Sequence, residues 1–436
     1  MFETIRNAWK VADLKKKLIY TLIVVLLYRV GTALPVPYVS SAMLDSMSQL
    51  TSGSIFQYLN ILSGNAFGQA TLFALGIQPY ITASIVLQLL CVAIPALERL
   101  SKQGEEGKKK INQLTRYTTV ILALITAFGY YKLLDSQGII TKSGFFPALV
   151  IIACYCAGSA LVMWLAEKIN ENGIGNGISI ILFANIVAGL PGTVQTFIAL
   201  CTGNYPFNDG YVPFWAGIII TVVAIAVIVA MVAFIVWMTN SERRLPVQYA
   251  KKVVGRKMYG GQSSNLPIKV NMVGVMPIIF ANSIITIPQT IAMFTGTENK
   301  VWAFIVNMFS PANIFYAFLT FVLIIAFAYF YIAISFNPVE VANNIKNQGG
   351  FIPGIRPGRP TSDYISKVLS RITFIGAILL SVVAVLPLLI NVFSGGNLAA
   401  LAFGGSSIII VVGVVLETIR EIEAQMTMRH YKGFLE

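Results

Sequence analysis

The chain has 436 residues, of which 56% are hydrophobic and only 11% charged, with a mean hydropathy of +0.75. A soluble domain carries about a quarter charged residues, so this composition excludes a water-soluble enzyme, and apolar runs along the whole chain exclude a single membrane anchor. Lys and Arg number 31 against 18 Asp and Glu, and the one histidine, His430, argues against a His-based metal or acid–base site. The sequence therefore predicts a polytopic membrane protein without a metal or cofactor.

Residues 1–17 predict a helix that lies in the membrane interface. Phe2, Ile5 and Trp9 recur at helical spacing beside basic residues, as in amphipathic interfacial helices. The apolar run that follows exceeds the 7–15 residues of a signal-peptide core, and no small-residue cleavage site comes after it. We therefore expect an uncleaved first membrane span.

Ten segments are long and apolar enough to cross a membrane. A helix needs about 20 mainly apolar residues for this, and runs such as 218–236 are apolar on every face, whereas barrel strands alternate with a period of two. The predicted spans are 18–34, 70–95, 117–134, 147–166, 177–200, 214–238, 271–295, 312–336, 372–393 and 401–419.

The positions of Lys and Arg predict how these spans are oriented. If the N-terminus faces the cytoplasm, 27 of the 31 basic residues fall in cytoplasmic segments. Lys132, Lys142 and Lys300 then lie on the other side, and Arg29 lies within the first span. Because basic residues concentrate in cytoplasmic loops, we expect both termini in the cytoplasm.

Two glycine-rich segments do not fit nucleotide-binding motifs, and the spans do not fit an ion-coupled transporter. The phosphate-loop pattern around Gly104–Lys108 needs glycine at position 102 and finds lysine, and Gly173–Gly177 lacks the third glycine of a dinucleotide fingerprint. No Asp, Glu or His lies near the centre of a predicted span, where coupled transporters place such residues. A small-solute transporter with a broken helix at Gly173–Gly177 and a non-transporting scaffold remain alternatives.

Four strings, in this order and spacing, resemble the SecY/Sec61-alpha family of protein-conducting channels. They are 64–66 with 73–85, 173–179, 266–271 and 354–358. The resemblance implies an all-α membrane protein of ten spans in two pseudo-symmetric five-helix halves. It implies these parts: 1–17, a cytoplasmic interfacial helix; 18–200, the first half, with a plug at 54–65; 201–213, an outer hinge loop; 214–419, the second half, with cytoplasmic loops 239–270 and 337–371; and 420–436, a cytoplasmic tail.

The function implied by the resemblance is transport of polypeptides. Such a chain is not an enzyme but the central pore-forming subunit of the Sec translocon in the bacterial cytoplasmic membrane. It passes unfolded secretory polypeptides across and releases signal sequences and transmembrane segments sideways into lipid. The implied partners are SecE and SecG as subunits, the ATPase SecA, the ribosome through its RNA, the preprotein with its signal sequence, and membrane lipid.

The resemblance also assigns residues to a plug and to a constriction. The segment 54–65 is too short to span the membrane, and Ile55, Leu59 and Leu62 form one helical stripe. An aliphatic ring excludes ions because it offers no group to replace their hydration shell. The implied plug residues are Ile55, Phe56, Tyr58, Leu59, Ile61 and Leu62, and the implied pore ring is Ile77, Ile81, Ile178, Leu182, Ile279 and Ile410. Leucine at 182 departs from the isoleucine common in the family.

A lateral gate and a docking face complete the implied sites. The gate lies between the second and seventh spans, with Thr82, Ile85 and Gln88 facing Ser283 and Ile287. Long basic cytoplasmic loops suit docking of SecA and the ribosome, and Pro353, Pro357 and Pro360 suggest an exposed, rigid tip. The implied docking residues are Arg243, Arg244, Lys251, Lys252, Arg256, Lys257, Arg356 and Arg359.

Overall fold

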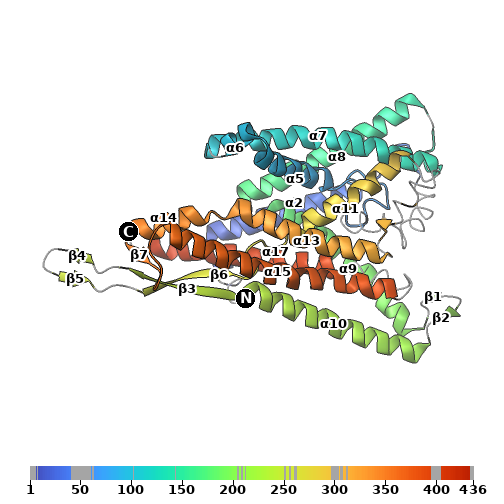
Figure 1. Ribbon diagram of the computed structural model, residues 1–436. Coiled ribbons are helices and arrows are strands. Elements are labelled where there is room, and N and C mark those ends of the chain that lie inside the picture. Colours follow the sequence, from blue (N-terminus) through green and yellow to red (C-terminus); the bar gives the residue numbers. More distant parts are fainter. Residues whose placement is uncertain are drawn as a thin grey trace.

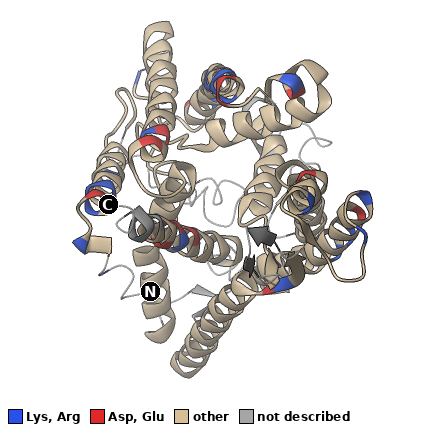
Figure 2. Cartoon of the chain, turned by 90° about the vertical axis from the view of Figure 1, so that its left-hand side faces the viewer, with Lys and Arg blue, Asp and Glu red and all other residues tan. Residues whose placement is uncertain are grey.

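The computed structural model is a bundle of long helices that run alongside one another, with a β-hairpin projecting from one end (Figure 1). Seen from that end, the helices surround the middle of the bundle, and Lys and Arg residues lie at several of the helix ends that face the viewer (Figure 2). The structure describes residues 6, 8–40, 60, 63–101, 103–142, 144–203, 206–207, 210–211, 213–249, 252–254, 257–259, 263–295, 304, 308–310, 313–393 and 404–432.

The first half of the chain folds almost entirely into helices. Pro79 occupies the first turn of one helix, where its missing N–H costs nothing, and the Asn176 side chain caps another by accepting from Ile178 N at 3.1 Å. An extended Ile94 before Pro95 bends the chain by 107°. The helices are α2 (Ala12–Gly31), α5 (Gln78–Ala93), α6 (Pro95–Ser101), α7 (Glu105–Ser136), α8 (Phe145–Asn172) and α9 (Gly177–Cys201).

The second half adds further helices and a small sheet. Its helices are α10 (Phe214–Asn240), α11 (Met276–Thr295), α13 (Ile314–Ser335), α14 (Pro338–Asn347), α15 (Arg359–Phe393) and α17 (Gly404–Lys432). Its strands are β1 (Pro206–Phe207), β2 (Gly210–Tyr211), β3 (Glu242–Tyr249), β4 (Lys252–Val254), β5 (Lys257–Tyr259), β6 (Ser263–Lys269) and β7 (Gly350–Phe351).

The segment 239–270, treated as a loop in the sequence analysis, contains a paired β-hairpin. Strand β3 pairs antiparallel with β6 from Glu242↔Lys269 to Gln248↔Ser263, and β7 pairs with the other edge of β3. Leu245 and Val247 alternate with exposed residues and are buried in a cluster that includes residues of α14 and α15. Burial of one face therefore fixes the register of the hairpin.

Several predicted spans differ from the observed helices at their ends. The spans 177–200 and 214–238 agree with α9 and α10 within two residues. The span 70–95 is helical only from Gln78, because residues 72–77 form turns. Helices α7 and α15 begin 12 or more residues before their predicted spans, which start at 117 and 372. Charged first turns therefore extend helices beyond the apolar runs.

Six helical segments in the described part are long and apolar enough to cross a membrane. They are α7, α8, α9, α10, α15 and the segment of α13 with α14, and the bent pair α5–α6 adds a seventh if counted as one span. Three other predicted spans, 18–34, 271–295 and 401–419, overlap α2, α11 and α17. The protein is thus a multi-pass membrane protein, and the full count of ten spans stays a prediction.

Apolar side chains lie both inside the bundle and on its outer surface. The largest buried cluster draws on α2, α5, α8, α9, α10, α11, α13, α15 and α17. On α10, Trp215 and Ile219 are 77% and 63% exposed. An apolar exterior on this scale is suited to lipid rather than to water.

Candidate functional site

All six residues of the implied pore ring belong to the largest buried cluster or pack against it. Five of them are 5% exposed or less, and Ile178 is half-buried against the cluster. They come from the start of α5, from α9, from α11 and from α17. The fold thus gathers these aliphatic side chains from distant parts of the sequence into one core, and their role in conduction stays a prediction.

Before α5, the chain follows an irregular path that we call the collar, residues 63–77. Turns make up most of it, and its backbone bonds to the segment that follows the first helix, with Leu72 N donating to Leu34 O at 2.9 Å. The Tyr130 and Tyr155 hydroxyls donate to the carbonyls of Phe67 and Ala70. The collar ends at Ile77, the first residue of the ring.

A cavity of about 330 Å³ lies between α5, α7 and α11, which we call the seam cavity. Most of its lining is apolar, and its polar side chains carry hydroxyl groups and the amide of Gln78. The ring residues Ile77 and Leu182 line it together with collar residues. The ring and the cavity therefore share a wall.

Of the predicted gate residues, three line the seam cavity and two do not. Thr82, Ser283 and Ile287 line it, whereas Ile85 is buried and Gln88 donates to Ser84 Oγ on its own helix at 3.4 Å. Ser283 donates to Ile279 O within α11. Within the described part of the chain, the predicted gate residues therefore make no hydrogen bond between α5 and α11.

Sequence reasoning missed the polar contact that does cross the seam. Gln78 Nε2 donates to Thr286 Oγ1 at 3.5 Å, from α5 to α11. Both residues are apparent in the sequence as polar positions in apolar helices. Spacing alone does not tell which polar residues of two helices meet.

The six implied plug residues, from Ile55 to Leu62, lie outside the described residues. Next to them, Gly64 has a φ of +65°, and a Cβ there would lie 2.8 Å from Arg29 Nη1 and 2.9 Å from Asn185 Oδ1. Arg29 therefore points into the bundle from α2. Asn60 Oδ1 accepts from Gly68 N at 2.8 Å and ties the start of this region to the collar.

The implied docking residues cluster at the hairpin end of the bundle. Arg243 and Arg244 are exposed on β3, and Arg244 Nε lies 2.7 Å from Glu242 Oε1. Lys252 and Lys257 lie on the described backbone of β4 and β5, while Lys251 and Arg256 lie outside the described residues. At the root of the hairpin, partial burial and the nearby Arg420 lower the pKa of Lys269.

Arg356 occupies an exposed turn between β7 and α15. Gly354 and Gly358 flank it with φ of +82° and +101°, a left-handed region that glycine adopts readily. Thr361 Oγ1 donates to Arg356 O at 2.8 Å and ties the turn to the first turn of α15, which begins at the exposed Arg359. The backbone is thus held while the guanidinium remains free to reach a partner.

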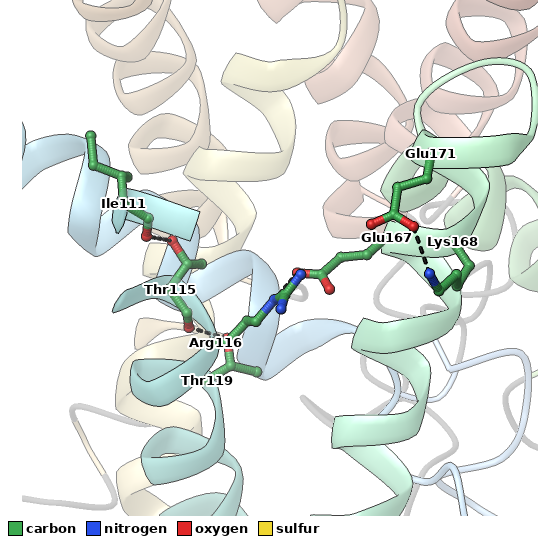
Figure 3. Close-up of polar contacts among 7 residues, drawn as sticks. All are labelled: Ile111, Thr115, Arg116, Thr119, Glu167, Lys168 and Glu171. Atoms are coloured by element: carbon green, nitrogen blue, oxygen red, sulfur yellow. Dashed lines mark hydrogen bonds and ion pairs between the residues drawn. The ribbon is translucent and has the colours of Figure 1, made fainter. Parts of the chain in front are cut away.

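An ion pair joins α7 and α8 near the same end (Figure 3). Arg116 Nε lies 2.8 Å from Glu167 Oε1, with the side chains 50% and 14% exposed. On α8, Lys168 Nζ lies 2.6 Å from Glu171 Oε2, one turn further along the helix.

We expect the Arg116–Glu167 pair to contribute little to stability. Because one partner is half exposed, the coupling free energy from Arg116→Gln and Glu167→Gln should be about 1 kcal/mol or less. A double-mutant cycle on chemical unfolding in detergent measures it, with Lys168→Gln and Glu171→Gln as a more exposed control cycle. A coupling several times larger would contradict this expectation.

Within the described residues, no group of three or more His, Cys, Asp or Glu side chains could hold a metal ion. The chemical character of the seam cavity comes from its lining, which is mostly apolar with hydroxyl groups and the amide of Gln78. Such a lining can exclude ions and bind apolar segments.

Comparison with known proteins gives consistent matches along the chain. A family model described as SecY matches residues 71–419. The SecY protein translocase subunit of Streptomyces galbus is 43% identical over 449 residues, and that of Mycobacterium tuberculosis strain H37Rv is 42% identical over 456, each covering 100% of both chains.

Solved structures share the fold at lower sequence identity. One described as a protein conducting channel has a TM-score of 0.66 at 18% identity, covering 94% of this chain and 92% of the other. One described as Sec61 in a canine ribosome-channel complex has a TM-score of 0.63 at 17% identity, with the same coverage. At this identity the likeness concerns the fold alone.

Proposed function

The chain belongs to the SecY family of protein translocase subunits, and from this premise we propose that it forms the polypeptide-conducting pore of a Sec translocon in the bacterial cytoplasmic membrane. Unfolded secretory polypeptides pass through the pore ring. Signal sequences and transmembrane segments leave sideways between α5 and α11. Because the chain belongs to this family, we no longer consider the two alternatives, a solute transporter and a non-transporting scaffold.

The observation that carries this proposal is the wall shared by the ring and the seam cavity. Ile77 and Leu182 belong to the ring and also line the cavity. A polypeptide held at the ring is therefore adjacent to a largely apolar space between two helices of different halves. An aliphatic ring offers no group that replaces the hydration shell of an ion, and it forms no hydrogen bonds that would retain a passing side chain.

Sideways release follows from the balance of two small energies. A signal-sequence core has 7–15 apolar residues, and each Leu or Ile gains about 0.3–0.6 kcal/mol at the membrane centre. A hydrogen bond between membrane helices contributes about 0.6 kcal/mol on average. The Gln78–Thr286 contact, at 3.5 Å, is thus weak enough for a bound apolar segment to replace.

The proposed orientation puts the hairpin, the Arg356 turn and both termini in the cytoplasm. Ala8 and Leu14, near the N-terminus, share a buried cluster with Ile422 of α17. This contact supports the proposal that both ends of the chain lie on the same side of the membrane. The basic residues of the hairpin and the Arg356 turn would meet SecA or ribosomal RNA, and phosphate contacts of this kind weaken as salt rises. A structure similar in fold is a ribosome-channel complex.

We also propose two halves that separate at the seam, residues 18–200 and 214–419, linked by 201–213. The proposed small subunits are SecE and SecG, with a preprotein as client and lipid at the open gate. Co-purification from the native membrane tests the subunits, because a pore of this family should retain a small helical partner.

Locking the seam should stop transport. In a variant without the four native cysteines, Gln78→Cys and Thr286→Cys joined by a short thiol-reactive crosslinker prevent α5 and α11 from separating. We expect SecA-driven translocation of a preprotein into inverted vesicles to fall to the background level, since the ring cannot widen while its two halves are tied.

The matched control joins two helices of the same half. Arg116→Cys and Glu167→Cys, crosslinked by the same reagent, tie α7 to α8 and should leave translocation near the uncrosslinked rate. Normal transport through channels fully crosslinked between positions 78 and 286 would refute the seam as the moving part.

A further inference from the structure

We propose that Tyr130 and Tyr155 are positioning residues for the pore ring. Their hydroxyls hold the collar, residues 63–77, on its irregular path, and the collar in turn fixes Ile77 at the ring. This inference rests on the proposed function and adds to it a fixed part of the channel wall.

Hydrogen bonds within the collar, such as Ala70 N to Phe67 O and Thr71 N to Ala66 O at 3.2 Å each, close turns but form no regular helix or strand. Helices and strands satisfy their own backbone groups, whereas most collar residues lie in turns. Asn65 and Ala70 have φ of +71° and +47°, a left-handed conformation that is unfavourable for residues with a Cβ. Such a conformation persists only where surrounding groups determine it.

The two tyrosines add hydrogen bonds that reach the collar from neighbouring helices. Tyr130 on α7 donates to Phe67 O, and Tyr155 on α8 donates to Ala70 O at 3.2 Å. Both tyrosine side chains are fully buried, and their rings lie 5.0 Å apart. Phe67 O also accepts from Ala70 N at 3.2 Å, so the Tyr130 hydroxyl adds a second bond there. Inside a membrane protein a backbone carbonyl has little water to turn to, so the Tyr155 hydroxyl is an important partner of Ala70 O.

Close packing leaves the collar little room to shift. A Cβ on Gly158 of α8 would lie 2.1 Å from Leu72 O, so the backbone passes directly over that helix. The Phe73 ring stacks on Tyr28 of α2 at 5.5 Å and 10°. Helices α2, α7 and α8 thus all contact the collar.

The collar is continuous with the ring residues Ile77 and Ile81. Gly76 N bonds to Phe73 O at 2.8 Å, and Ile77 O accepts from Ile81 N at 3.1 Å in the first turn of α5. Phe67 also lines the seam cavity. A displaced collar therefore moves Ile77 and Ile81 together and opens a gap at the ring.

The test removes only the two hydroxyls. Tyr130→Phe and Tyr155→Phe, singly and together, are reconstituted in planar bilayers, and the resting ion conductance is measured. We expect Tyr155→Phe to raise it by about tenfold, because the buried Ala70 O then loses the donor from α8. Tyr130→Phe should raise it less, because Phe67 O keeps its bond from Ala70 N. The control Tyr316→Phe removes the same atom from a buried tyrosine of α13 that packs in another cluster and should leave the conductance unchanged.

A second readout separates positioning from general stability. A thiol introduced by Leu75→Cys, in a background without native cysteines, should react faster with a membrane-impermeant maleimide in the Tyr130→Phe and Tyr155→Phe channels than in the Tyr316→Phe channel. Thermal unfolding of all three should be similar. Equal reactivity in the three channels would overturn the inference.

A pair of alanine variants covers the case in which the double tyrosine variant does not fold. Gly158→Ala forces Leu72 away from α8 and should leak, whereas Gly189→Ala on α9 has open space around its Cβ and should not. If the tyrosine variants and Gly158→Ala all keep the resting ion conductance of the wild type, the inference is wrong. If the wild-type vesicles still translocate a preprotein, the proposed function survives that failure, and if they do not, the proposed function itself fails.

Discussion

Ile81→Asn combined with Ile178→Asn is expected to make the resting channel conduct ions. Both residues belong to the implied ring and lie in or against the largest buried cluster. An amide at these positions offers water and ions the hydrogen bonds that an aliphatic constriction withholds. Lowering the barrier to ion passage by only about 1.4 kcal/mol raises the rate tenfold, so two such changes should give a large leak.

Single-channel recording in a planar bilayer measures this effect without any partner protein. The matched control is Ile81→Leu with Ile178→Leu, which keeps the ring aliphatic, as Leu182 already does at one position. We expect the leucine variant to stay closed. An Asn variant with wild-type resting conductance would remove these two residues from the constriction.

Arg356→Glu should impair SecA-driven translocation at least tenfold while the channel still inserts and folds. The turn holds the Arg356 backbone through Thr361, and the side chain is exposed. A hydrogen bond to a charged partner contributes about 1.5–3 kcal/mol, which corresponds to about ten- to a hundredfold in affinity. Reversal of the charge adds repulsion to that loss.

Translocation into inverted vesicles at limiting SecA measures the rate. Lys142→Glu makes the same change of charge on the side proposed to face outward and should transport normally. Unfolding in detergent checks that both variants are equally stable. A wild-type rate for Arg356→Glu would show that this turn does not dock the motor.

The apolar runs predicted α9 and α10 well because these helices contain little that contradicts the pattern. Chain segments of about 20 apolar residues have few alternatives in a membrane. Helix ends were less predictable, since α7 begins at Glu105 and α15 at Arg359. Charged residues can form a helix as well as apolar ones, so these helices start before the apolar run that predicts the span.

The collar and the hairpin are the parts of the fold that the sequence analysis missed. Residues 70–77 are as apolar as a span, and the bonds from Tyr130 and Tyr155 that keep them irregular come from distant positions. The hairpin had a local signal, because Leu245 and Val247 alternate with polar residues at the period of a strand.

The candidate site was predicted in outline and less well in detail. Family motifs predicted six ring residues, and the fold places these residues in or against one buried cluster, while their role in conduction stays a prediction. At the seam, the residue pairs depended on which helix faces meet. Gln78 and Thr286 touch, whereas Ile85 is buried elsewhere in the core, because helix rotation is set by packing and cannot be derived from spacing.

The length of α15 has a mechanical consequence. Its 35 residues, at about 1.5 Å each, extend about 52 Å, against about 30 Å for the hydrocarbon core of a bilayer. The helix begins three residues after Arg356 and continues without a proline from Ser362 to Leu386. If a motor docks at the Arg356 turn as proposed, a push there would pass along this helix as far as Pro387, and the motor could tilt the helix without entering the pore.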